Sequence, residues 1–238
     1  MTPSTLDSLK ARGRGWVDQA LVRIGERAGP DLPRILSGAA SYIETGRLLR
    51  EAGLALPAPA RTRFEVLDAA LDIASTAAQP LYLEFGVWQG ESMRYVSGRL
   101  TAATARFVGF DSFEGLPDDW TASFGRGAFS TAGVAPDTSD PRVSYIKGWF
   151  DDTLPTFAIP PHDRLIVNVD SDIYSSAATV LGAVGSALAP GDLLYFDEFN
   201  AHAHEGRAFH EFRIASGQNY RVLAVTKGAE HILFQRTG

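Results

Sequence analysis

The sequence predicts an α/β fold, with a doubly wound, mostly parallel seven-stranded sheet and an N-terminal helical appendage. Short apolar runs alternate along the chain with segments whose apolar residues recur at helical spacing, which is the pattern of consecutive βα units. The last two apolar runs are separated by a Lys227-Gly228 turn, which indicates a hairpin. The first 60 residues show only helical spacing and are expected to precede the sheet.

The N-terminal segment is predicted to form two or three helices. Leu6–Arg27 and Ile35–Ala52 carry apolar residues at loose helical spacing, and Leu54–Ala60 is a connector rich in Ala and Pro. We therefore expect an N-terminal helical appendage or lid at residues 1–60 and a main domain at residues 61–238. A packing appendage is favoured over a lid or a dimer arm, because nothing in this segment is chemically distinctive.

The main domain is predicted to begin with a helix at Arg63–Ala77, where Phe64, Leu67 and Leu71 share one face. Further helices are expected at about 89–100, 151–154, 174–188 and 205–215. Connections of this kind between parallel strands are typical of a doubly wound sheet. The runs predicted as strands are Leu81–Gly86, Phe107–Phe110, Val143–Ile146, Leu165–Val169, Leu193–Phe196, Tyr220–Val225 and His231–Phe234.

One long connection interrupts this regular order. Asp118–Asp140 is rich in Gly, Ser, Thr and Asp and has no periodicity. Loops of this length inside a domain are usually functional lids or disordered segments. We expect this loop, together with the N-terminal helices, to shape a ligand pocket.

Composition excludes several classes of protein. The net charge of −6 gives no basic field for a nucleic-acid backbone. No apolar run approaches the length of a transmembrane helix, and the N-terminus lacks the apolar segment of a secretion signal. The absence of cysteine excludes disulfides, thiolate catalysis and Cys-ligated zinc. We expect a cytoplasmic protein with a small-molecule partner, no nucleic-acid partner and no membrane partner.

Acidic residues follow two of the predicted strands. Asp170 and Asp172 follow Leu165–Val169, and Asp197-Glu198 follows the strand that ends at Phe196. Both strands would end at the same edge of a parallel sheet, where ligands bind in such folds. Carboxylates gathered there repel one another unless a counter-charge is present. A hard divalent cation with oxygen ligands is the simplest counter-charge.

The segment Glu84–Ser92 would form the turn from the first strand into its helix. Gly86 and Gly90 let the backbone approach a ligand closely and leave helix N–H groups free. Their spacing differs from the dinucleotide motif G-x-G-x-x-G, and Glu84 would repel a pyrophosphate. A ligand with a cationic amine suits Glu84 better, although a plain structural turn is about as well supported.

Two further strand ends carry binding candidates. Asp111 ends the second predicted strand, where a carboxylate accepts hydrogen bonds from ribose hydroxyls. The competing interpretation is a helix N-cap, since Ser112 and Glu114 follow. Trp149 and Phe150 follow the third strand and could enclose an adenine ring, although ordinary core packing is the more common role of such residues.

Five motifs together resemble one family. They are EFGVWQGES, GFDSFEGLP, KGWFDDTLP, VDSDIYSS and FDEFN, and they span about Leu81–Phe212. In this order and at strand ends, they resemble the macrocin O-methyltransferase (TylF-type) family. Its members are class I S-adenosylmethionine-dependent methyltransferases that act on sugar hydroxyls of natural products. The resemblance implies a Rossmann-like methyltransferase fold and a role in natural product biosynthesis.

The resemblance also implies roles for individual residues. S-adenosyl-L-methionine and Mg²⁺ would be the cofactors, and the family often has Asp-Asp where this chain has Asp197-Glu198. Glu198 could therefore ligate the metal through water, which magnesium keeps readily. The implied metal ligands are Asp170, Asp197 and Glu198. The candidates for cofactor binding are Glu84, Gly86, Gly90, Ser92, Asp111, Ser112, Gly148, Trp149 and Phe150.

Methyl transfer to an alcohol also requires removal of the hydroxyl proton. A metal-bound hydroxyl has a lowered pKa, and Asp170 is the first candidate to take its proton. His202 and His204 are rival bases, although a solvated loop position is the more common role for either. A catechol-type site would have a lysine shortly after the first acid, and this chain has Ile173 and Tyr174 there.

Other functions remain open from the sequence. The acceptor could be a polyphenol in place of a sugar, or the chain could be a nucleotide-sugar-dependent transferase, because Asp170-Ser171-Asp172 has the Asp-x-Asp spacing of such enzymes. A nicotinamide-dependent oxidoreductase would need closer glycine spacing and a Tyr/Lys or His proton donor. A non-catalytic interaction protein would not need the acid cluster. The resemblance and the N-terminal arm also suggest a homo-oligomer.

Overall fold

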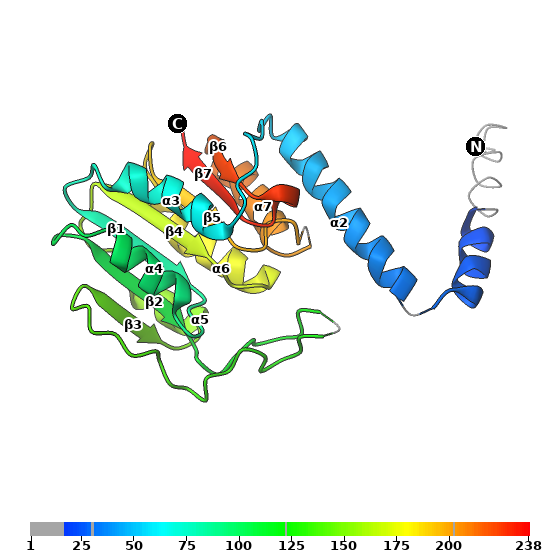
Figure 1. The fold of residues 1–238 in the computed structure, drawn as a ribbon, viewed down its shortest axis with the longest axis horizontal. Coiled ribbons are helices and arrows are strands. Elements are labelled where there is room, and N and C mark those ends of the chain that lie inside the picture. The colour runs from blue at the N-terminus through cyan, green and yellow to red at the C-terminus, as the bar shows by residue number, and fades with distance from the viewer. Residues whose placement is uncertain (1–16, 30, 122, 202) are drawn as a thin grey trace, which may run out of the picture.

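The computed structural model of the protein describes residues 17–29, 31–121, 123–201 and 203–238 (Figure 1). A seven-stranded sheet forms its centre, with helices on both faces and α2 (Asp31–Glu51) leading away from it. The strands are β1 (Pro80–Phe85), β2 (Arg106–Asp111), β3 (Val143–Lys147), β4 (Arg164–Val169), β5 (Leu193–Phe196), β6 (Tyr220–Val225) and β7 (Ile232–Arg236). The α-helices that follow α2 are α3 (Arg63–Ala74), α4 (Glu91–Arg99), α5 (Phe150–Thr153), α6 (Tyr174–Val184) and α7 (Glu205–Ser216).

The strand order is β3-β2-β1-β4-β5-β7-β6. The first five strands pair in parallel, and β7 runs antiparallel to both β5 and β6. The order reverses beside β1, because β2 lies on one side of it and β4 on the other. Ligands bind at such a switch point, outside the carboxyl ends of the strands. The predicted fold class, including the end hairpin, is confirmed.

Side chains of β1 alternate between two apolar cores, one on each face of the sheet. Leu81, Leu83 and Phe85 join the core that also contains buried residues of α6 and α7. Tyr82 lies in the second core, with buried residues of α3 and α4. This alternation follows from the pleat of a strand, and it decides on which face each polar side chain of β1 lies.

The predicted elements correspond closely to the observed ones. α3 ends at Ala74, and the predicted helix at 174–188 is α6 followed by a 3₁₀ turn at Gly185–Ala187. The segment 118–140 has no helix in its described part. Of the helix predicted at Leu6–Arg27, residues 17–27 are helical and residues 6–16 lie outside the described part of the chain.

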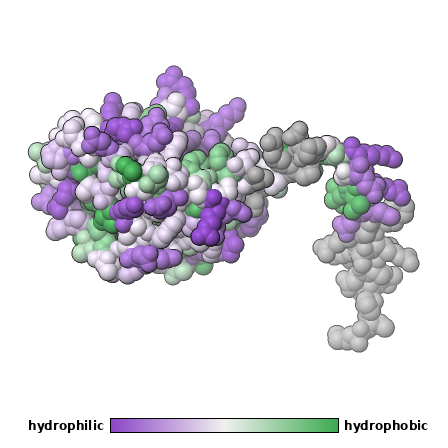
Figure 2. All heavy atoms as spheres, turned by 90° about the horizontal axis from the view of Figure 1, so that it is seen from below, coloured by the Kyte–Doolittle hydropathy of each residue, from purple (hydrophilic) through white to green (hydrophobic). Residues whose placement is uncertain are grey.

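The end of α2 packs on the main sheet unit. Leu48 and Leu49 are buried, and the Ser41 hydroxyl donates to the backbone carbonyl of Asn200 at 2.5 Å. Apolar side chains at residues 17–27 are exposed on the arm, away from the main body (Figure 2). The division at residues 60 and 61 falls in an irregular segment and stays a prediction, as does self-association. No helix within the described ranges is both long and apolar enough to cross a bilayer.

Candidate active site

A cavity of about 440 Å³ lies at the carboxyl ends of the central strands. Its lining combines the turns that follow β1, β2 and β3 with the acidic segments that follow β4 and β5. Most of the predicted site residues lie in this lining, whereas Glu84 and Gly90 do not. The predicted residues in the lining are Gly86, Ser92, Asp111, Ser112, Gly148, Trp149, Phe150, Asp170, Asp197 and Glu198.

The turn after β1 is closely fitted to the neighbouring strand end. Gly86 has φ +97°, and a Cβ there would lie 1.6 Å from the backbone oxygen of Asp170. Only glycine permits this approach, which brings the turn against the acidic segment. Trp88 also has a positive φ, +47°, and its side chain is half exposed at the cavity.

Asp111 organises this turn through its carboxylate. One oxygen accepts hydrogen bonds from the backbone N–H groups of Val87 and Trp88, both at 2.8 Å, and the other accepts from Phe113 N–H at 2.7 Å. No helix begins in the described residues between Asp111 and β3, so the N-cap interpretation is wrong. Each carboxylate oxygen has more than one lone pair, so a ligand hydroxyl can still bind.

Glu84 lies behind the cavity wall. Its side chain is fully buried, and its Oε1 accepts a hydrogen bond from the hydroxyl of Ser92, which itself lines the cavity. Burial raises the pKa of Glu84 to about 8. The structure therefore places Ser92 between Glu84 and the cavity, and any effect of Glu84 on a ligand passes through that hydroxyl.

The remaining predicted cofactor residues fall into two groups. Gly90 is the N-cap of α4, with φ +72°, and it shapes the helix start without reaching the cavity. One wall of the cavity is formed by Gly148, Trp149 and Phe150. The ring of Phe150 packs edge-on against the buried ring of Phe85, with the ring centroids 5.7 Å apart. Phe150 thus serves both as core and as lining, while Trp149 remains 39% exposed and accessible to a ligand.

Three carboxylates converge on the acidic side of the cavity. One oxygen each of Asp170, Asp172 and Glu198 lies within 4.8 Å of the others, and we call these residues the acid trio. Asp172 reaches this position with φ +62°, a conformation that is rare for a non-glycine residue. Glu198 Oε2 is buried without a hydrogen-bond partner. Such an oxygen is suited to a cation.

Electrostatics in the acid trio favour a counter-charge. Burial, and next the charge of Asp197, raise the pKa of Asp170. Burial also raises the pKa of Asp172 to about 7 and that of Glu198 to about 10. These directions show that the ionised carboxylates are unfavourable together, and a divalent cation would remove that penalty.

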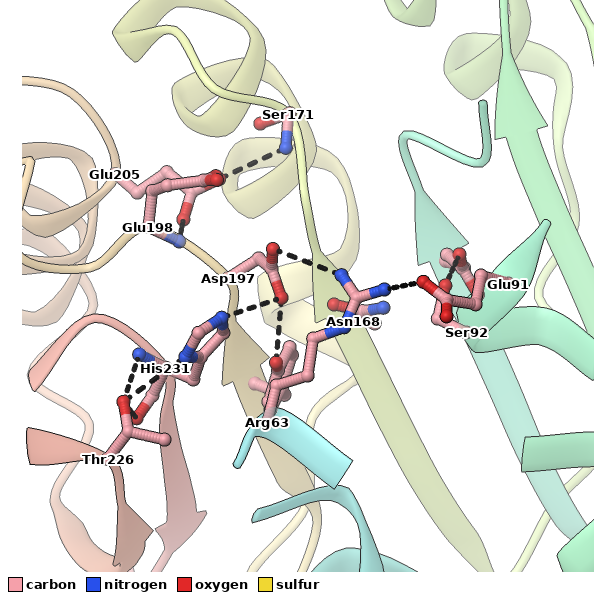
Figure 3. Close-up of polar contacts among 12 residues, drawn as sticks. Arg63, Glu91, Ser92, Asn168, Ser171, Asp197, Glu198, Glu205, Thr226 and His231 are labelled. Atoms are coloured by element: carbon pink, nitrogen blue, oxygen red, sulfur yellow. Dashed lines mark hydrogen bonds and ion pairs between the residues drawn. The ribbon is translucent and has the colours of Figure 1, made fainter. Parts of the chain in front are cut away.

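Asp197 faces a different set of partners. The Tyr195 hydroxyl donates to its Oδ1 at 2.8 Å, and Arg63 and His231 each approach the carboxylate at 3.6 Å (Figure 3). The predicted metal set of Asp170, Asp197 and Glu198 thus differs from the observed trio in one member. Both Asp197 and Asp172 line the cavity. The ion pair with Arg63 is made by Asp197 and gives that carboxylate a counter-charge.

Of the two histidines predicted as rival bases, the structure describes only His204. His202 lies outside the described residues. His204 Nδ1 accepts a hydrogen bond from the backbone N–H of Tyr174 at 3.3 Å, and His204 is not part of the cavity lining. His202 as a base stays a prediction.

Some residues of the site could not be selected from the sequence. Asp172 is one of the acids that follow the strand ending at Val169, but the metal set predicted from the sequence does not include it. Arg63 and Glu205 reach the site from α3 and α7, and no local pattern marks either residue. Both are identified only by contacts between elements far apart in the chain.

Comparison with known proteins agrees with the resemblance inferred from the motifs. Residues 126–229 match the model of the macrocin-O-methyltransferase (TylF) family. The chain is 29% identical to 8-demethyl-8-(2,3-dimethoxy-alpha-L-rhamnosyl)-tetracenomycin-C 4'-O-methyltransferase of Streptomyces olivaceus over 155 residues, which are 55% of this chain and 57% of that protein. It is 28% identical to mycinamicin III 3''-O-methyltransferase of Micromonospora griseorubida over 169 residues, 61% of this chain and 65% of that protein.

The matches to these relatives are partial. The chain spans less than two thirds of the length of each of the two curated relatives. The solved structure of the O-methyltransferase NovP matches with a TM-score of 0.59 and 23% sequence identity, over 76% of this chain and 84% of that one. Because the sequence identity is below 25%, this match supports the fold alone.

Proposed function

We propose that this chain, of which residues 126–229 match the macrocin-O-methyltransferase (TylF) family, transfers the methyl group of S-adenosyl-L-methionine to a hydroxyl of a small molecule with the help of a divalent cation. One observation carries the proposal. A single cavity is lined both by residues suited to a nucleoside with an amino-acid tail and by the acid trio. Methyl transfer needs a cofactor and an activated hydroxyl side by side, and this cavity has a place for each.

The cofactor side is formed by the turns after β1, β2 and β3. Asp111 lines the cavity and would bind the ribose, and Trp149 and Phe150 would enclose the adenine. Gly86, whose turn packs against the backbone of Asp170, and Ser92 also line the cavity and would contact the methionine portion. S-adenosylmethionine, when bound, would supply the electrophilic methyl group.

The acid trio has the donor set of a hard divalent cation, and Mg²⁺ is the simplest choice. Three carboxylate oxygens within 4.8 Å of one another, together with the unpartnered Glu198 Oε2, fit such an ion. Asp170, Asp172 and Glu198 would hold it, with Asp197 beside them. A bound divalent cation would lower the pKa of the acceptor hydroxyl and orient its oxygen.

Two carboxylates are candidates to accept the hydroxyl proton. Asp170 is our first candidate, and Asp172 lines the same cavity. Replacing Asp170 by Asn removes a proton acceptor while keeping the side-chain volume. We expect turnover to fall by about 10²- to 10⁴-fold, the usual contribution of a general base. Full metal-dependent turnover in Asp170→Asn would show that Asp170 is not the base, and Asp172→Asn and His202→Ala would then be compared.

The acceptor is proposed to be a sugar or a glycosylated natural product. One curated relative is named as an O-methyltransferase of a rhamnosyl-tetracenomycin, and the other as an O-methyltransferase of mycinamicin III. Trp88 and Phe129 both line the cavity, and their rings meet edge-on with centroids 5.7 Å apart. Exposed aromatic faces of this kind pack well against flat apolar faces of rings, which supports an acceptor that contains a ring.

A thermal shift experiment tests the proposal. S-adenosylhomocysteine, NAD and UDP would each be added with and without Mg²⁺, because a ligand that binds the native state raises its melting temperature. We expect S-adenosylhomocysteine to stabilise the protein and NAD and UDP to have no effect. A response to UDP alone would refute the methyltransferase assignment and favour a nucleotide-sugar-dependent transferase.

A further inference from the structure

Glu205 connects the two chain segments that carry the acid trio. It is the first residue of α7, and its side chain is fully buried. One carboxylate oxygen accepts a hydrogen bond from Ser171 N–H at 3.0 Å, and the other accepts from Glu198 N–H at 3.1 Å (Figure 3). Ser171 stands between Asp170 and Asp172. Each bond therefore holds the backbone of a segment that contributes to the acid trio.

These two bonds begin where the sheet stops holding the strand ends together. The β4–β5 pairing ends with Val169 opposite Phe196, and the last backbone bond runs from Asp197 N–H to the Val169 carbonyl at 3.1 Å. Beyond that point the two segments have no ladder between them. The Glu205 carboxylate takes the place of the missing ladder, because it accepts from one amide on each segment.

The position of Glu205 is itself closely determined. A Cβ on the next residue, Gly206, would lie 2.6 Å from the backbone oxygen of Phe199, so only glycine allows α7 to begin this close to the segment that follows β5. On the other side, Asp172 has φ +62°, which persists only where the surroundings hold the backbone firmly. The Glu205 bond to Ser171 lies one residue away from this strained position.

The chemistry of the contact requires a carboxylate. Two N–H donors need two acceptors, and a glutamine side chain offers only one acceptor oxygen beside an NH₂ donor. Aspartate has the two oxygens but is shorter by one methylene group. Glutamate alone among the acidic and amide side chains combines two acceptors with this length.

We propose that Glu205 is a positioning residue that fixes the separation of the two acidic segments and thereby sets the affinity of the acid trio for a divalent cation. This inference rests on the proposed function, because it assumes that the acid trio binds a cation. Glu205 is not among the residues that line the cavity, so it acts through the backbone of Ser171 and Glu198. Partners that orient metal ligands in this way commonly change metal affinity by about 10- to 100-fold.

The test measures Mn²⁺ binding in the absence of cofactor and acceptor, by calorimetry and by the Mn²⁺ EPR signal. Glu205→Gln and Glu205→Asp are compared with wild type and with a control in the same helix, Glu211→Gln. Glu211 is exposed and contacts Arg207 and Tyr174. We expect both Glu205 variants to bind Mn²⁺ about 10- to 100-fold more weakly with an altered EPR signal. Glu211→Gln should bind as wild type does.

Binding of S-adenosylhomocysteine to the same proteins separates a local effect from general distortion. We expect its affinity to stay within about twofold in every variant, because the cofactor wall lies on other strand ends. Wild-type Mn²⁺ affinity in Glu205→Asp would overturn the inference, since charge alone would then suffice. Failure of both Glu205 variants to fold would also overturn it. A wild-type protein that binds S-adenosylhomocysteine but no Mn²⁺ would instead refute the proposed cation site.

Discussion

The buried carboxyl group of Glu84 predicts a specific dependence of stability on pH. Its Oε2 has no hydrogen-bond partner, and Asn168, its register partner on β4, has an Oδ1 that is likewise buried and unpartnered. A proton on Glu84 would give its buried carboxyl group a hydrogen-bond donor. Burial, the largest cause, and the nearby charge of Asp197 raise its pKa, whereas Ser92 and Arg63 lower it.

The magnitude follows from the pKa of about 8 in the folded protein against an ordinary value of 4.5. Because each factor of ten in proton affinity is worth about 1.4 kcal/mol, ionised Glu84 costs the folded state about 5 kcal/mol at high pH. For a group whose pKa is raised on folding, the contribution to the free energy of unfolding is fully present below the pKa of the unfolded state. That contribution is lost as the pH rises through the pKa of the folded state. Between pH 5 and pH 8 wild type should therefore lose about 3 kcal/mol from Glu84 alone.

Glu84→Gln isolates this contribution, because glutamine keeps the shape and an acceptor for the Ser92 hydroxyl but does not titrate. Urea denaturation in the presence of EDTA would give the free energy of unfolding of both proteins at pH 5, 6, 7 and 8. The stability of Glu84→Gln relative to wild type should rise by about 3 kcal/mol across this range, or about 6–12 °C in melting temperature. The other buried acids occur in both proteins and cancel in the difference.

Glu51→Gln, an exposed substitution in α2, is the control and should follow the wild-type curve. If the wild-type and Glu84→Gln curves are parallel within about 1 kcal/mol, Glu84 does not titrate with a raised pKa, and the reasoning from its burial is refuted.

Three further predictions concern the cavity. Gly86→Ala should abolish S-adenosylhomocysteine binding and destabilise the protein by about 3 kcal/mol or more in urea denaturation. The control is Gly98→Ala, which has open space around it in α4 and should be neutral or slightly stabilising. Equal effects of the two substitutions would contradict the close-approach argument. Arg63→Met should lower the free energy of unfolding by about 2 kcal/mol, because Asp197 loses its counter-charge in a largely buried place, and an unchanged urea midpoint would show that the pair contributes nothing. Asp172→Asn should weaken Mn²⁺ binding in calorimetry by about tenfold or more, and a larger loss in Asp197→Asn would favour the ligand set predicted from the sequence.

Local pattern was enough to predict the sheet and the edge that carries the site. The strands are short apolar runs, and the acids that follow β4 and β5 stand directly after such runs. Because parallel strands end at one edge, residues after Val169 and Phe196 had to meet there, whatever the details of packing. The cavity lining confirms that placement for Asp170 and Glu198.

The tertiary structure alone decided which side chains face the ligand and which support it. The pleat and the sheet faces put Glu84 behind Ser92, and a left-handed backbone at Asp172 brought that carboxylate into the acid trio. Arg63 and Glu205 come from helices distant in sequence, and one compensates Asp197 while the other joins the two acidic segments. The reason is physical: sequence spacing determines where a strand ends, whereas convergence of carboxylates depends on backbone torsions and on charges supplied by other elements.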